Sequence, residues 1–236
     1  CPSMELLFLN DTPVRITKDP RGLMEGMEYD CFLSYETDNL AIPPNARHIL
    51  IKANQERFEQ LWAAVNWLSL AKPQGITIWT KDRTSMSRLV KQRFRIIKAA
   101  GGVVSKGNQI LLIHRLGKWD LPKGKVEKGE QKITAAVREI MEECSVQVVP
   151  IMELCSTWHT YTRDKVVMLK KTTWYAMACI DDTTMRPQLE EGVDKVSWLP
   201  EAELNEVLNN SYAAIRYVID THRSYVAFAA TRKLLG

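Results

Sequence analysis

The segment from residue 131 to residue 144 constrains the fold most, because its side chains repeat with the period of an α-helix. One face of this helix carries apolar residues at steps of three and four: Ile133, Val137, Ile140 and Cys144. A separate face carries the carboxylates of Glu139, Glu142 and Glu143. An amphipathic helix needs a core that covers its apolar stripe. The neighbouring segments must therefore supply a packing surface.

Strand patterns lie on both sides of this helix. Apolar runs predict strands at residues 96–104, 109–114, 146–155, 166–170, 173–180 and 195–199. Two further helices fit residues 201–208 and 212–222. Helices interleaved with strands are typical of an α/β fold. We therefore assign residues 95–236 to one α/β domain.

The first 94 residues show a smaller α/β pattern. A hairpin is predicted at residues 5–16, and strands are predicted at 29–35, 48–52 and 76–80. Residues 55–70 predict a helix, because apolar and aromatic residues recur at steps of three and four: Phe58, Leu61, Trp62, Val65 and Leu68. Trp67 lies beside this apolar stripe. We interpret the two tryptophans as core residues rather than as a stacking surface. Residues 1–94 are expected to form a small N-terminal α/β domain of unknown role, in which we find no catalytic motif.

The charge, hydropathy and cysteine content of the chain limit the kinds of molecule it can bind and the compartment in which it can work. The net charge of +4 is spread along the chain and suits an anionic small molecule at least as well as nucleic acid. The densest basic stretch, residues 81–98, has apolar residues at helical spacing, so we interpret it as a solvated helix face and disfavour nucleic acid. No apolar run approaches the ~20 residues that span a bilayer. The five cysteines lack the spacing of a disulfide framework or a zinc site, and we expect a cytoplasmic protein.

The carboxylates of the central helix indicate a cation site. Glu139, Glu142 and Glu143 stand at i, i+3 and i+4, so they are neighbours on one face. Their mutual repulsion costs a few tenths of a kcal/mol per pair, and a bound divalent cation reverses the sign. Oxygen ligands suit Mg²⁺ or Mn²⁺, the ions of phosphoryl chemistry. The alternative is an ordinary solvated helix face.

The wider context favours the cation site, because the helix and the loop before it resemble the Nudix box, G-x5-E-x7-R-E-U-x-E-E-x-G-U with U aliphatic. The matching positions are Gly124, Glu130, Arg138, Glu139, Ile140, Glu142, Glu143 and Val146. The last glycine of the box is replaced by Ser145. The resemblance extends from about residue 95 to residue 222, and it implies an α/β/α sandwich with a mixed sheet.

The resemblance also implies roles for individual residues. Glu142 and Glu143 would bind Mg²⁺, with Mn²⁺ as the alternative ion, and Arg138 would orient the glutamates through salt bridges. Glu139 would be either a metal ligand or the general base that accepts a proton from water. A loop carboxylate often completes such a site, and we choose Glu191, beside a glycine, over Glu190.

The substrate class is predicted from two features. Residues 119–125, Trp-Asp-Leu-Pro-Lys-Gly-Lys, look like the Nudix branch that takes diadenosine polyphosphates, oxidised nucleoside triphosphates or diphosphoinositol polyphosphates. Tyr161 lies 15 residues beyond Val146, near the place of a tyrosine that marks diadenosine polyphosphate hydrolases. The lysines that flank the loop, Lys123, Lys125 and Lys128, either contact phosphate or are simply solvated. Lys106 is interpreted as a turn residue.

The sequence thus predicts a hydrolase of a phosphoanhydride bond in a nucleoside-diphosphate-linked substrate, with a dinucleoside polyphosphate or a nucleoside triphosphate as first choice. ADP-ribose and diphosphoinositol polyphosphates are alternatives. A rival class is a Nudix-like regulator that binds a nucleotide metabolite without cutting it. The N-terminal domain would fit an interaction or homo-oligomerisation module, whether the second domain is a hydrolase or a regulator.

Overall fold

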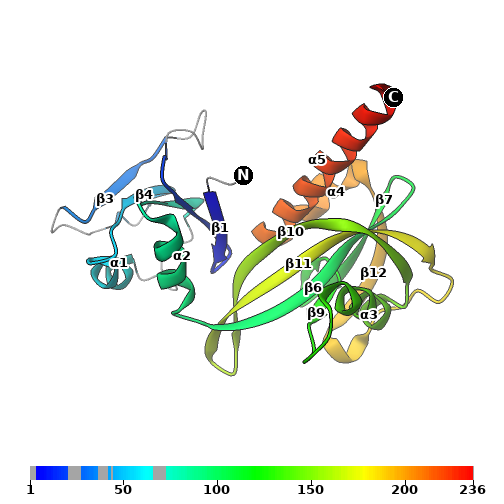
Figure 1. The fold of residues 1–236 in the computed structure, drawn as a ribbon. Helices are drawn as coiled ribbons and strands as arrows, with labels where there is room; N and C mark the ends of the chain where they lie inside the picture. The colour runs from blue at the N-terminus through cyan, green and yellow to red at the C-terminus, as the bar shows by residue number, and fades with distance from the viewer. Residues whose placement is uncertain (1–3, 21–27, 37–41, 44, 66–72, 236) are drawn as a thin grey trace. The chain divides into compact units, whose positions relative to one another are not determined.

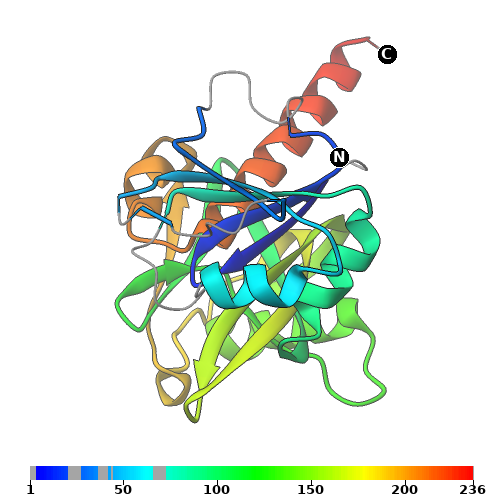
Figure 2. The same ribbon diagram turned by 90° about the vertical axis from the view of Figure 1, so that its left-hand side faces the viewer.

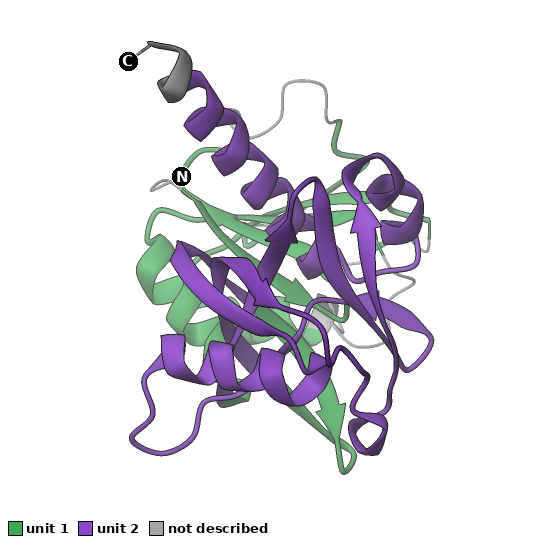
Figure 3. Cartoon of the chain, turned by 90° about the vertical axis from the view of Figure 1, so that its right-hand side faces the viewer, with its two compact units in different colours: residues 1–96, 158–169 green, residues 97–157, 170–236 purple. Residues whose placement is uncertain are grey.

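The computed structural model describes residues 4–20, 28–36, 42–43, 45–65 and 73–235. The chain divides into two units, which are coloured separately in Figure 3. Unit 1 consists of residues 1–96 and 158–169, and unit 2 consists of residues 97–157 and 170–236. Residues 158–169 are the end of a long hairpin whose remainder belongs to unit 2. Trp67 and Leu68, expected in an N-terminal helix, lie outside the described residues.

Unit 1 is a mixed sheet with helices on one face. Its elements are β1 (Met4–Leu9), β2 (Thr12–Thr17), β3 (Cys31–Ser34), β4 (His48–Lys52), α1 (Phe58–Val65), β5 (Gly75–Trp79) and α2 (Arg83–Lys91). The strand order is β1-β2-β5-β4-β3, in which β1 and β2 are antiparallel and the remaining pairs are parallel. Phe58 of α1 and Met86 of α2 are buried in the same hydrophobic cluster, and Figure 2 shows both helices on one side of the strands.

The hairpin end of residues 158–169 contributes to unit 1 as well. Phe8 of β1 pairs with His159 in parallel register, and the backbone N–H of Asn10 donates to the hydroxyl of Thr160 at 2.7 Å. Leu169 is fully buried in the unit 1 core, against which Trp158 also packs. The core of unit 1 therefore includes residues from two distant parts of the sequence.

Unit 2 contains the sheet on which the central helix packs. Its elements are β6 (Arg95–Lys106), β7 (Gln109–Arg115), β8 (Lys118–Asp120), β9 (Lys123–Lys125), α3 (Lys132–Cys144), β10 (Gln147–Arg163), β11 (Val166–Asp181), the 3-10 helix η2 (Leu189–Glu191), β12 (Val193–Pro200), α4 (Glu201–Leu208) and α5 (Ala213–Leu235). The main strand order is β12-β7-β6-β11-β10, with β8 on β7 and β9 on β6 (Figure 1).

Side chains of the unit 2 strands alternate between two hydrophobic clusters. On β7, Leu111 and Ile113 join the cluster that contains Ile140 of α3, whereas Leu112 joins the cluster that contains Ile219 of α5. A period of two residues places alternate side chains on opposite faces of a sheet. Helices therefore cover both faces, and the α/β/α sandwich expected from the sequence is confirmed.

The structure differs from the sequence predictions in several details. The two strands expected at 166–170 and 173–180 are one strand, β11, because Lys170 and Lys171 interrupt the apolar pattern but not the strand. The last helix continues to Leu235, beyond the buried His222, where the amphipathic pattern ends. Ile133, expected on the apolar face of α3, is 39% exposed, and the buried residues there are Ala135, Ala136, Ile140, Glu143 and Cys144. None of the helices in the described ranges is both long enough and apolar enough to cross a membrane.

Candidate active site

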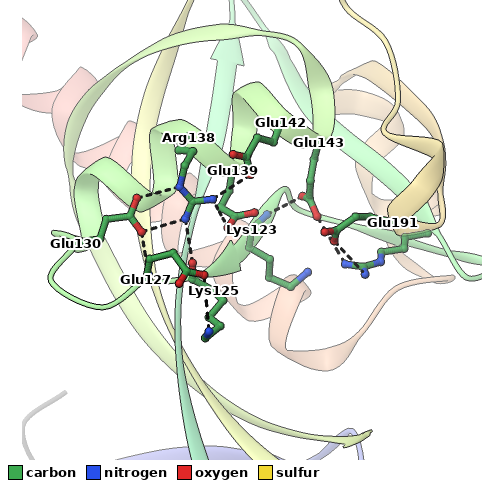
Figure 4. A network of polar contacts seen from close by, with 10 residues as sticks. Lys123, Lys125, Glu127, Glu130, Arg138, Glu139, Glu142, Glu143 and Glu191 are labelled. Carbon is green, nitrogen blue, oxygen red and sulfur yellow. Dashed lines mark hydrogen bonds and ion pairs between the residues drawn. The ribbon is translucent and has the colours of Figure 1, made fainter.

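Arg138 is the centre of a hydrogen-bond network on the exposed side of α3 (Figure 4). Its Nε and Nη2 bind the two carboxylate oxygens of Glu130 at 2.9 and 3.0 Å. Its Nη1 donates to Glu139 at 2.7 Å and to Glu142 at 2.9 Å, and its Nη2 donates to the carbonyl of Lys125 at 3.0 Å. A guanidinium has five N–H donors, and these five contacts can use all of them. Arg138 therefore ties the loop before α3 to two of its carboxylates.

This network also changes the protonation of its partners. The hydrogen bonds from Arg138, followed by the backbone N–H of Glu127, lower the pKa of Glu130 to about 2. The same bond to Glu130 raises the pKa of Arg138. Both groups therefore stay charged across the physiological pH range.

Glu139 packs directly over Gly124 of β9. A Cβ at position 124 would overlap both carboxylate oxygens of Glu139, so no larger residue fits while the carboxylate keeps this position. The Glu139 side chain is only 12% exposed, and burial raises its pKa against the opposing effect of Arg138. Glycine at position 124 is thus required by the close approach of a carboxylate, not by a turn.

Glu143 is the most deeply buried of the three glutamates, with 1% exposure. Its Oε2 accepts the backbone N–H of Lys123 at 2.9 Å, and its Oε1 has no hydrogen-bond partner in the described structure. Burial raises its pKa to about 7, although the neighbouring Lys123 and Arg115 lower it. A buried carboxylate oxygen without a hydrogen bond is unfavourable unless a cation coordinates it.

Glu191 is brought near this carboxylate by the loop that contains η2. The backbone N–H of Gln188 donates to the carbonyl of Glu143 at 3.2 Å, and that of Arg186 donates to the carbonyl of Cys144 at 3.0 Å. These bonds fix the loop to the C-terminal end of α3. Glu191 and Glu143 then face the same guanidinium, that of Arg115, and Figure 4 shows the two carboxylates side by side.

Ser145, where the Nudix box has glycine, takes the conformation that glycine favours. Its φ and ψ are 53° and 40°, in the left-handed region, and its N–H donates to the carbonyl of Met141 at 2.9 Å. A left-handed residue at this position is a common way to end a helix. The substitution therefore leaves the helix end intact at the cost of some backbone strain.

The lysines expected to contact phosphate differ in environment. Lys123 is buried, and its ammonium binds the carboxylate of Asp120 at 2.5 Å and the carbonyl of Leu121 at 3.3 Å. This internal ion pair competes with any contact to substrate. Lys125 is 62% exposed, with a weak ion pair to Glu127 at 3.7 Å, and is free to reach an anion.

Other predicted positions lie elsewhere. Lys106 forms an ion pair with Asp182 at 2.7 Å. Lys128 and Glu190 are exposed. Tyr161 is half-buried on β10, in the segment that belongs to unit 1, whereas the glutamates belong to unit 2.

Sequence reasoning missed three charged residues of the site. Arg115 ends β7, Asp120 ends β8, and Lys170 lies within β11. Burial, followed by the charge of Lys123, lowers the pKa of Lys170 to about 8. The only sequence signal for them is a charged residue in or at the end of an apolar strand, which is too common to be specific.

The glutamates do not converge on one point in this structure. Within the described ranges, no group of three or more His, Cys, Asp or Glu side chains is gathered closely enough to hold a metal ion. The carboxylate of Glu142 turns to Arg138, and Glu143 faces Arg115 and the backbone of Lys123. The carboxylates expected to share one neighbourhood are thus divided between two arginines. The donor set still fits a hard divalent cation, because carboxylate oxygens are its preferred ligands and Oε1 of Glu143 has no hydrogen bond.

Comparison with known proteins gives one family. The family model of the NUDIX domain matches residues 96–220. An RNA pyrophosphohydrolase of Pelagibacter ubique is 34% identical over 67 residues, which are 27% of this chain and 42% of that protein. An RNA pyrophosphohydrolase of Brucella anthropi is 29% identical over 79 residues, 34% of this chain and 44% of that protein. The chain therefore spans less than half the length of these two relatives. A solved NUDIX hydrolase from Nitrosomonas europaea is 18% identical, covers 55% of this chain and 90% of its own, and has a TM-score of 0.44.

Proposed function

This chain belongs to the NUDIX family, and from that membership we propose that it is a metal-dependent pyrophosphohydrolase that cleaves a phosphoanhydride bond in a nucleotide-linked substrate. One observation supports the proposal most: the buried carboxylate of Glu143 has an oxygen without a hydrogen bond beside a second carboxylate, that of Glu191. Burying such a group is costly for a protein that gains nothing from it. Active sites are where costs of this kind are retained.

The carboxylates of Glu142, Glu143 and Glu191 would hold the divalent ion, and that of Glu139 is the alternative fourth ligand. We propose Mg²⁺ as the ion, with Mn²⁺ as the alternative, because both prefer oxygen ligands. When bound, such an ion neutralises phosphate charge and lowers the pKa of water.

The residues around the ion have separate tasks. Arg138 holds Glu139 and Glu142 in place through bonds of 2.7 and 2.9 Å. Burial raises the pKa of Glu139, which makes it a better proton acceptor than an exposed glutamate. Its Oε1 accepts a hydrogen bond from Arg138, which leaves Oε2 available to accept a proton. We therefore propose Glu139 as the general base, with the ligand role as its alternative.

The substrate proposal remains a dinucleoside polyphosphate or a nucleoside triphosphate. It is supported by the sequence of residues 119–125, and the names of the two relatives are consistent with pyrophosphate cleavage. We propose the exposed Lys125 as a phosphate contact, since its ammonium has only one weak ion pair. For Lys123 we now favour an internal role, because its ammonium is buried against Asp120. Tyr161 stays a proposal as a substrate contact.

The division of the chain into residues 1–94 and 95–236 also remains a proposal. All the proposed ligands follow residue 95, so we assign the chemistry to the second part. The hairpin end of residues 158–169 contributes to the core of unit 1, which means that the two parts share one segment of chain.

A substrate panel tests the proposed function. The whole chain would be incubated with diadenosine polyphosphates, nucleoside triphosphates, ADP-ribose and diphosphoinositol polyphosphates, each with Mg²⁺, with Mn²⁺ and with a chelator. We expect metal-dependent cleavage of at least one nucleotide into two phosphorylated products. Tight binding of a nucleotide without cleavage under any condition would favour the regulator instead.

A further inference from the structure

Arg115 is a cation between two proposed metal ligands, yet it is loosely held. Its Nη1 lies 3.6 Å from Oε1 of Glu143, and its Nη2 lies 3.7 Å from Oε2 of Glu191. Charge-assisted hydrogen bonds between such groups are typically ~2.7–2.9 Å long. Arg115 therefore neutralises the two carboxylates by charge without the hydrogen bonds that a guanidinium usually makes.

Two buried atoms at this contact are unsatisfied. Nε of Arg115 and Oε1 of Glu143 have no hydrogen-bond partner in the described part of the chain. Arg138, on the neighbouring side of α3, differs in that its three nitrogens make five hydrogen bonds at 2.7 to 3.0 Å. Of the two arginines, Arg138 is therefore held by a full set of hydrogen bonds, whereas Arg115 lies in the site with donors that make no hydrogen bond to the described residues.

The backbone of Arg115 is fixed, so only its side chain can move. The residue pairs with Val193 of β12 on one side and with Lys118 of β8 on the other. Its side chain is 30% exposed, which leaves a path toward solvent. The carboxylates are held independently of it, because Glu143 binds the N–H of Lys123 and the loop of Glu191 is hydrogen-bonded to the end of α3.

We propose that Arg115 is a displaceable counter-cation, which neutralises Glu143 and Glu191 before a divalent ion binds and must leave them when it does. The inference rests on the proposed metal-dependent function and adds a residue that opposes metal binding. A divalent cation that coordinates Oε1 of Glu143 would lie close to the guanidinium of Arg115, whose Nη1 is 3.6 Å from the same oxygen. Two cations so close together repel each other. Metal binding would thus exchange one internal cation for an external one.

A structural role would give the opposite effect. If Arg115 served only to position Glu143 and Glu191, its removal would disorder the ligands and weaken metal binding. If it is a competitor, its removal strengthens metal binding. The sign of the change therefore distinguishes the two roles.

The test is calorimetric titration of the metal-free whole chain with Mg²⁺, and with Mn²⁺, in the absence of substrate. Arg115→Met keeps a flexible unbranched side chain, although a shorter one, and removes the charge. We expect the Kd to fall at least about fivefold, which is the factor for two unit charges roughly 4 Å apart in a water-like dielectric. Arg115→Lys keeps the charge and should bind with a Kd close to that of the unaltered chain. Arg115→Gln, which is also neutral, provides a second measurement of the same effect if the methionine variant folds poorly.

A matched control separates this effect from general charge. Lys132→Met removes an exposed cation from the first turn of α3, ten residues and ~15 Å along the helix from Glu142, and should change the Kd by less than twofold. An unchanged or higher Kd in Arg115→Met would overturn the inference. If the unaltered chain binds neither ion, the proposed function itself fails and the inference falls with it.

Discussion

Replacing Glu143 by glutamine should make the metal-free protein more stable at pH 8, because the buried carboxylate is held at a cost. Burial raises the pKa of Glu143 from its ordinary 4.5 to about 7. The folded state therefore keeps a proton that the unfolded chain has already lost between these two values. Stability contributed by this group is present below pH 4.5, falls as the pH rises toward 7, and is constant above it.

The size of the effect follows from the pKa difference. At about 1.4 kcal/mol for each pKa unit, the loss between pH 4.5 and pH 7 amounts to about 3 kcal/mol. Glutamine is neutral at every pH and avoids this loss, so Glu143→Gln should gain up to about 3 kcal/mol over the unaltered chain at pH 8 and much less at pH 5. For a chain of this length the gain corresponds to a rise in Tm of roughly 6–12 °C.

Thermal and denaturant unfolding of the metal-free chain, at pH 5 and pH 8 with a chelator present, measures this difference. Glu142→Gln is the matched control, since Glu142 is the adjacent residue but is 47% exposed, and its effect should be under about 0.5 kcal/mol at both pH values. A Glu143→Gln variant that is less stable than the unaltered chain at pH 8, or equally shifted at both pH values, would refute the reasoning.

The remaining predictions concern the residues that support the glutamates and the part of the chain that is needed for hydrolysis. Gly124→Ala should lower turnover at least tenfold by displacing Glu139, while the free energy of unfolding changes by less than about 2 kcal/mol. In a Glu139→Ala background the same alanine should have no further effect on turnover. Losses of turnover that add in the double variant would contradict this explanation. Ser145→Gly should keep turnover within about threefold and shift stability by no more than about 1 kcal/mol, since strain relieved at φ 53° is offset by chain entropy, and kinetics with thermal melting check both. A fragment of residues 95–236 should retain hydrolysis but melt at lower temperature, because Trp158 and Leu169 lose the unit 1 core; a folded fragment that binds Mg²⁺ and cleaves nothing would show that residues 1–94 complete the site.

The parts of the site that could be predicted from the sequence are those set by local periodicity. The helix with two faces follows from steps of three and four, and the structure places it at Lys132–Cys144 with Ile140 and Cys144 buried. The bonds from Arg138 to Glu142 and Glu139 are also local, since these residues lie within one turn of α3. The alternation of β7 between two cores likewise follows from strand patterning.

What could not be predicted depends on contacts between distant residues. Arg115 faces Glu143 and Glu191 only because β7 and the η2 loop meet at the end of α3. The burial of Lys123 against Asp120 depends on how β8 and β9 attach to the edges of the sheet, which no local pattern fixes. The same applies to Leu169, which is distant in sequence from the first 96 residues and is nevertheless buried in the core of unit 1.

The measurement that tests the central claim most directly is the turnover of Glu142→Gln and Glu143→Gln on the substrate identified in the panel, at saturating Mg²⁺. Each change keeps the size of the side chain and removes one negative charge from the proposed site. If the carboxylates hold the ion that neutralises phosphate and activates water, turnover should drop by at least about a hundredfold, which is about 3 kcal/mol of transition-state stabilisation. Full activity in both variants would contradict the catalytic assignment and leave a nucleotide-binding regulator as the better account.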